Sequence, residues 1–188
     1  SSGSGGGLSS DSQFNTVGGT NAGDSFSGTD ATNNTLIGYN AGTAITTGDQ
    51  NTCLGYDAGK SITTAARLTA IGHRAGEDVT GQNNTIVGAN AAISMTSGTS
   101  NTVMGVGAGE SITSGDSHTA IGSNALNSQT SGQGNTAIGT NAGKSVNSNS
   151  CTFVGFKSGE NATGNTNTII GFEAFKTTNN GGQNTAVG

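Results

Sequence analysis

Large apolar residues recur along this chain at a nearly constant short interval, each time inside the pattern N-T-x-φ-G, in which φ is a large aliphatic residue. Most of these repeats are 16 or 17 residues long, and the first has 19. Internal repetition on this scale is typical of solenoid proteins, in which each repeat packs only against its neighbours. Aligned on the first residue of the pattern, the repeats start at the following positions: Asn15, Asn34, Asn51, Leu68, Asn84, Asn101, His118, Asn135, Cys151, Asn167 and, for a partial copy, Asn184.

We number the positions of a repeat as columns, counting the asparagine as column 1, so that the consensus reads N-T-x-φ-G-x-x-A-G-x-x-φ-T-x-G. Column 4 is aliphatic or methionine in every repeat except the first, which has Gly18, and column 8 is alanine except for Ser158. The repeat is too short for two helices, and its glycines and β-branched residues disfavour helix. We therefore predict an all-β fold: a parallel β-solenoid, or β-roll, of about ten 16–17 residue coils over 15–188, each with two short strands joined by turns.

Two columns are predicted to hold the coils together through their backbone chemistry. Glycine in columns 5, 9 and 15 suits tight corners, where the backbone needs positive φ or a close approach. Asparagine in column 1 is expected to form a ladder of amides along the rod, satisfying polar groups of the turns. Three residues in this column interrupt the series: Leu68, His118 and Cys151.

The two ends of the chain differ from the repeats. Residues 1–14 are rich in glycine and serine without periodicity, and we expect a flexible linker or a segment added to the natural chain. The sequence stops at Gly188, five residues into an eleventh coil. Because an uncapped coil exposes unpaired strand edges, we expect the natural polypeptide to continue beyond it.

Column 3 is apolar as well as column 4, as in the adjacent pair Val103 and Met104. Neighbouring side chains of a strand point to opposite faces, so we expect column 4 to fill the coil and column 3 to form an outward apolar stripe. Soluble monomers rarely expose such a stripe, and we expect copies of the chain to cover it in a homotrimer. A dimer, or a wide coil enclosing both columns, is the alternative. The predicted interface residues are Val17, Leu36, Cys53, Ile86, Val103, Phe153 and Ile169.

Composition narrows the possible partners. Only 30% of residues are hydrophobic, and 34 glycines occur without any proline or tryptophan, which disfavours an ordinary globular core. Charged residues make up 9% and the formal charge is −5, unlike the highly charged disordered class. With 6 Lys+Arg against 11 Asp+Glu, we expect no nucleic-acid partner, and the absence of a long apolar run predicts no membrane insertion.

The repeats resemble a known class of proteins. The segments NTLIGYNAG, NTCLGYDAG, NTAIGTNAG and NTIIGFEAF are similar to the N-[ST]-x-x-[IL]-G repeats of trimeric fibre and adhesin proteins, over 15–188. The period and wording resemble bacteriophage tail fibres or tailspikes more than trimeric autotransporter heads, whose repeat is typically shorter with S-V-A-I-G. The resemblance implies a trimeric β-roll fibre on a virion tail or cell surface, acting as shaft or receptor-binding head. A bacterial autotransporter head is the alternative.

Enzyme chemistry finds no support in the residues. His73 and His118 lie three coils apart, and no column places a nucleophile, a base and an orienting acid together. Cys53 and Cys151 are six coils apart, roughly 29 Å at strand spacing, which is too far for a disulfide. The acids do not form the calcium-binding β-roll motif. We expect no enzyme, no cofactor and no metal site.

Column 6 carries the candidate ligand-binding residues. Aromatic rings there are either edge stabilisers of the solenoid or a platform for the sugars of a cell-surface glycan or for a protein receptor. The predicted residues are Tyr39, Tyr56, His73, Phe156 and Phe172, with Arg74 in column 7. Threonine in columns 2 and 13 suggests a different function, because regular threonine ladders on flat β-solenoids are used to bind ice. A shaft that only spaces a distant binding tip is a third possibility.

Overall fold

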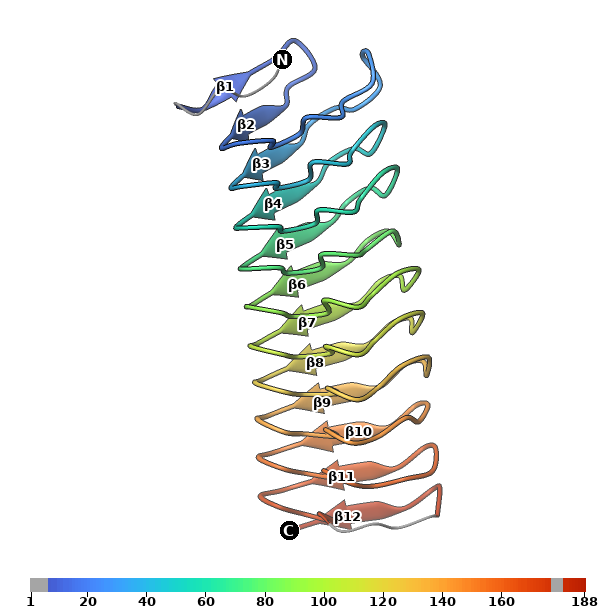
Figure 1. Ribbon diagram of the computed structural model, residues 1–188. Helices are drawn as coiled ribbons and strands as arrows, with labels where there is room; N and C mark the ends of the chain where they lie inside the picture. The colour runs from blue at the N-terminus through green and yellow to red at the C-terminus, as the bar shows by residue number, and fades with distance from the viewer. Residues whose placement is uncertain (1–6, 177–180) are drawn as a thin grey trace.

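The computed structural model of the protein describes residues 7–176 and 181–188, and their strands stack in chain order into one rod (Figure 1). Strands β2 to β12 pair in parallel, and β1 pairs with β2 antiparallel. The strands are β1 Ser9–Ser10, β2 Thr16–Gly18, β3 Thr35–Ile37, β4 Thr52–Leu54, β5 Thr69–Ile71, β6 Thr85–Val87, β7 Thr102–Met104, β8 Thr119–Ile121, β9 Thr136–Ile138, β10 Thr152–Val154, β11 Thr168–Ile170 and β12 Thr185–Val187.

The predicted parallel β-solenoid is confirmed, with about ten turns of roughly 17 residues and no helix in the described ranges. Each strand covers columns 2 to 4 of one repeat, and neighbouring strands pair column to column. Between β4 and β5, for example, Thr52 pairs with Thr69 and Leu54 with Ile71. Because the register never slips, each column runs along the rod as one row of stacked side chains.

The return half of each coil is a stack of turns, so the expected second strand is absent from the described coils. Columns 7 and 9 adopt left-handed backbone, as at Asp57 (φ 53°) and Gly59 (φ 56°), which interrupts any extended run. Hydrogen bonds still join one coil to the next here: the Gly59 amide donates to the Ala75 carbonyl at 3.0 Å. The return half therefore satisfies its backbone groups without forming strands.

The structure reverses the expected orientation of columns 3 and 4. Column 3 points into the coil, where alanines of column 8 and large residues of column 12 cover it, and column 4 points outward. The residues expected to face a partner chain therefore lie inside their own coil: Val17 is 9% exposed, and Leu36, Cys53, Ile86, Val103, Phe153 and Ile169 are 0% exposed. The return half of the same chain covers them, which is why they need no partner.

The asparagine ladder of column 1 is buried inside the coil and is confirmed in detail. The Asn34 side-chain oxygen accepts a hydrogen bond from the Asn51 amide at 2.9 Å, and the Asn51 Nδ2 donates to the Ala65 carbonyl at 2.9 Å. Two of the three expected interruptions continue the ladder with other acceptors. His118 Nδ1 accepts from the Asn135 amide at 3.2 Å, and Cys151 Sγ accepts from the next coil's amide at 3.3 Å.

Glycine in column 5 is required by the close stacking of the coils. Gly55 has φ 137°, and a Cβ there would lie 2.5 Å from the carbonyl oxygen of Gly72 in the next coil. Both the backbone conformation and the contact exclude a side chain. This corner turns the chain from the strand into the return half.

Residues 8–14 cap the first coil, in contrast to the flexible linker expected there; residues 1–6 lie outside the described ranges. β1 pairs with β2, and Asp11 accepts hydrogen bonds from the backbone and side-chain nitrogens of Asn15 at 2.9 and 3.0 Å. Asp11 thus adds one rung to the asparagine ladder. Leu8 packs over Gly18, where a Cβ would lie 2.6 Å from Leu8 Cδ2, which explains the single glycine in column 4.

Candidate functional site

The most extensive regular surface of the rod is the outward side of the sheet formed by β2–β12, which we call the outer face and define as columns 2 and 4. Every one of these strands begins with threonine, and all but β2 end with a large aliphatic residue or methionine. The column 4 side chains are clearly exposed at several rungs: Leu54 43%, Met104 44%, Ile138 40% and Ile170 40%. Neither column contains a charged residue. The outer face is therefore a flat, uncharged surface of alternating hydroxyl and aliphatic rows.

The threonine hydroxyls of the outer face have almost no partners within the chain. The Thr16 and Ser10 hydroxyls lie 3.2 Å apart, and no other column 2 hydroxyl forms a hydrogen bond in the described ranges. Because the strands pair threonine to threonine, these hydroxyls form a regular row along the rod. They remain available to water or to another molecule.

The predicted aromatic residues gather into two separate groups. The Tyr39 and Tyr56 rings stack with centroids 5.4 Å apart, and Tyr56 and His73 stack at 5.3 Å, with interplanar angles of 8° and 10°. Near the other end of the rod, Phe156 and Phe172 stack at 5.3 Å. Tyr56 therefore has a ring against each of its faces, so a sugar can stack only on the outer face of a terminal ring of this row. The edges of the rings, with the tyrosine hydroxyls, remain accessible.

Arg74, the sixth predicted ligand residue, is engaged in a charged cluster beside the first aromatic row. Its Nε donates to a carboxylate oxygen of Glu77, and Lys60 Nζ lies 3.4 Å from Asp57 and 3.8 Å from Glu77. The hydrogen bond with Asp57 raises the pKa of Lys60. Since both basic side chains are about two-fifths exposed, these pairs contribute little to stability, and their charges are mutually satisfied.

The nucleophilic and titratable side chains inside the coil are structural. Cys53 is fully buried in column 3, and burial raises its pKa to about 12, so the thiolate nucleophile is not formed at neutral pH. Burial lowers the pKa of His118, which keeps its imidazole neutral in the ladder. In the described ranges, no three His, Cys, Asp or Glu side chains lie close enough together to hold a metal ion. No described helix has the length and apolarity to cross a membrane.

Sequence reasoning missed the outer face because it assigned column 4 to the core. A signal was present: threonine in column 2 shares its orientation with column 4, and a threonine turned inward in every coil would bury a hydroxyl that needs a partner. No protein-family model, curated protein or solved structure matches this chain. The function must therefore be inferred from the surfaces of the rod.

Proposed function

We propose that this chain is a non-enzymatic fibre segment that assembles through its outer face into a homotrimer, outside the cell or on a virion tail. It serves as the shaft or receptor-binding head of a phage tail fibre or surface adhesin that attaches to a host cell. The single observation that carries this proposal is the unbroken row of exposed aliphatic side chains on a flat, uncharged face. A contiguous apolar surface of this kind marks an interaction site.

The shape of the outer face favours copies of the same chain as its partners. Its rows repeat at the strand spacing of ~4.8 Å, so a second copy presents rows at the same interval, and the two align rung to rung. The face lacks charge, so identical copies do not repel one another there. Ten strand spacings of ~4.8 Å and three residues of ~3.3 Å give a planar footprint of about 500 Å².

That footprint is narrow for a stable pair, because a specific interface buries about 800 Å² on each partner. Three copies around a common axis improve on this, since each rod then contacts two neighbours and also buries surface along both margins of its outer face. The homotrimer expected from the sequence is thus retained, but its interface moves from column 3 to columns 2 and 4. The same assembly would serve a phage fibre or an autotransporter head.

Solution mass tests the assembly. We expect light scattering to give three times the chain mass of 18.2 kDa at micromolar concentration. The change Met104→Asp together with Ile138→Asp should reduce the mass to that of one chain while the β-sheet circular dichroism is retained. Ser114→Asp, in an exposed position on the return half of the same coil as Met104, is the matched control. A wild-type chain that stays monomeric contradicts the proposal.

For receptor binding on this segment, the two aromatic groups are the proposed contacts, with a cell-surface glycan or protein as the ligand. Exposed edges and hydroxyls at Tyr39 and Tyr56 supply the polar contacts, and Phe172, which is 72% exposed, supplies apolar area. Tyr39→Ala and Tyr56→Ala should weaken binding to host cells while leaving the assembled mass unchanged. Unchanged cell binding would leave the segment as a spacer.

Ice binding is the second candidate, because the structure turns the column 2 threonines outward in a regular row with unpartnered hydroxyls. A flat lattice of hydroxyl and aliphatic groups is suited to ordering water. This function needs the outer face uncovered, so it competes with trimer formation. Thermal hysteresis that disappears in Thr85→Tyr and persists in Ser114→Tyr would favour ice binding, and its absence from wild type would exclude it.

A further inference from the structure

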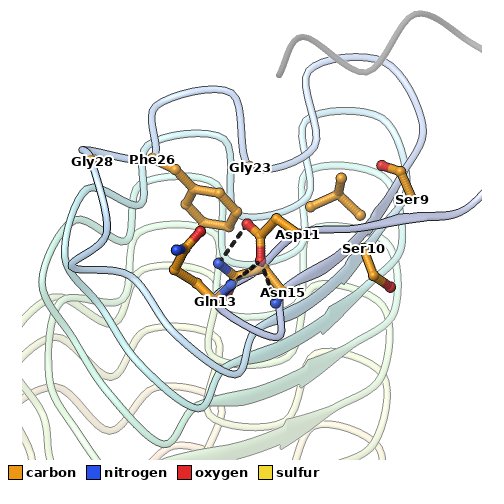
Figure 2. Close-up of a pocket in the computed structure, with 9 residues that line it drawn as sticks. Ser9, Ser10, Asp11, Gln13, Asn15, Gly23, Phe26 and Gly28 are labelled. Atoms are coloured by element: carbon orange, nitrogen blue, oxygen red, sulfur yellow. Dashed lines mark hydrogen bonds between the residues drawn. The ribbon is translucent and has the colours of Figure 1, made fainter.

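The first coil is the one place where the described rod departs from its repeat. It has 19 residues, and it carries Phe26 in column 12, where no other repeat has an aromatic residue. The cap of residues 8–14 lies against this coil, and together they enclose a pocket of about 220 Å³ at the end of the rod (Figure 2). Departures from a regular pattern are where binding sites are expected in repeat proteins.

The pocket combines one aromatic wall with several polar groups, as Figure 2 shows. The half-buried Phe26 ring packs over Gly23, where a Cβ would lie 2.9 Å from the ring. Ser9, Asp11 and Gln13 line the pocket from the cap. The Ser9 hydroxyl and the Gln13 side-chain amide form no hydrogen bond within the described part of the chain, so both are available to a ligand.

Asp11 is held rigidly as an ionised acceptor. Its Oδ1 accepts from the backbone amides of Gln13 and Asn15 at 3.0 and 2.9 Å, and its Oδ2 accepts from Asn15 Nδ2 at 3.0 Å. The pKa of this exposed carboxyl stays below its ordinary value, because these hydrogen bonds outweigh the opposing effect of its slight burial. Each oxygen keeps a lone pair that can accept from a ligand hydroxyl.

We propose that this pocket binds one monosaccharide unit of a carbohydrate. A sugar ring has an apolar face that packs on an aromatic side chain, and hydroxyls that bond to carboxylate, amide and hydroxyl groups. The volume lies below the ~300 Å³ at which pockets for drug-sized ligands begin, which fits a single ring. Asp11 disfavours an anion, and its negative charge is already stabilised by three N–H donors, which leaves little demand for a cation.

The pocket is separate from the outer face and from the aromatic groups of column 6, since it opens at the end of the rod (Figures 1 and 2). The inference therefore does not depend on trimer formation. It also goes beyond the proposed attachment function, because it assigns sugar binding to residues of the cap and the first coil.

Saturation-transfer NMR on the full 188-residue chain tests the pocket, with the methyl glycosides of glucose, galactose, mannose and N-acetylglucosamine as probes. We expect saturation transfer to the ring protons of at least one glycoside. Titration should then show at least a tenfold weaker affinity for Phe26→Leu and for Gln13→Ala. Leucine keeps the aliphatic character that column 12 has elsewhere, and circular dichroism of both variants should match that of wild type.

Tyr39→Ala is the matched control, because it removes an exposed aromatic ring away from the pocket, and it should leave the affinity unchanged. No transfer to any of the four glycosides overturns the proposal. So does an affinity that Phe26→Leu leaves intact, or one that only Tyr39→Ala reduces. The mass from light scattering is measured on the same samples, so that failure of the pocket and failure of assembly are distinguished.

Discussion

The adjacent residues Val103 and Met104 offer the sharpest test of how each coil is packed. Val103 is 0% exposed and lies in the ladder between Ile86 and Ala120, whereas Met104 is 44% exposed on the outer face. Val103→Ala removes two buried methyl groups at ~0.8 kcal/mol each and leaves a small cavity. We expect it to lower the free energy of unfolding by about 2–3 kcal/mol.

Met104→Ala should cost under ~1 kcal/mol within a single chain, because nearly half of that side chain is already in solvent. Urea unfolding followed by circular dichroism measures both values. It should be run at two protein concentrations, since any additional loss in Met104→Ala that comes from assembly depends on concentration. The loss in Val103→Ala does not.

The result that would refute this packing is the reverse order of the two variants. If Met104→Ala cost more than Val103→Ala at every protein concentration, column 4 would fill the coil and column 3 would face outward. The two residues are neighbours in one strand, so differences in backbone environment cannot explain a reversal. Ser114→Ala, on the exposed return half of the same coil, should be close to neutral and serves as the control.

Three further predictions concern groups buried inside the coil. Asn51→Ala leaves the Leu68 amide and the Ala65 carbonyl without their partners, and urea unfolding should show a loss of about 2–5 kcal/mol. His118 has a pKa below its ordinary 6.5 in the folded chain, so its contribution to stability is complete above pH 6.5 and is lost as the pH falls from there towards the lowered value. His118→Asn should therefore show a smaller loss of stability between pH 7 and 5 than wild type, and an equal loss would contradict the role of this imidazole. Cys53, with its pKa raised to about 12, should resist alkylation by iodoacetamide at pH 8 until urea unfolds the chain, as followed by mass spectrometry.

Much of the fold follows from the repeat itself. The period, the glycine of column 5 and the asparagine of column 1 predicted a parallel β-solenoid with an amide ladder, and both are present in the structure. These features are readable because each depends on local backbone chemistry. The continuation of the ladder through His118 and Cys151 was not expected, because it depends on side-chain atoms that happen to lie where the asparagine oxygen would be.

The candidate sites were less predictable. Stacking of Tyr39 on Tyr56 follows directly from their shared column, since parallel strands in register place equal columns above one another. The pocket beside Phe26 could not be predicted, because it forms only when residues 8–14 fold back onto the first coil. A glycine-rich opening gives no sequence pattern for such a contact.

The sequence by itself determined that the chain forms stacked coils, and which residues share a row. It also determined that two neighbouring apolar rows point to opposite sides of each strand, because alternation is a property of the extended backbone. Only the tertiary structure decided which row is inside. That choice depends on the side of the strand to which the return half folds, where alanines and large residues of the same coil cover Val103 and leave Met104 to solvent or to another chain.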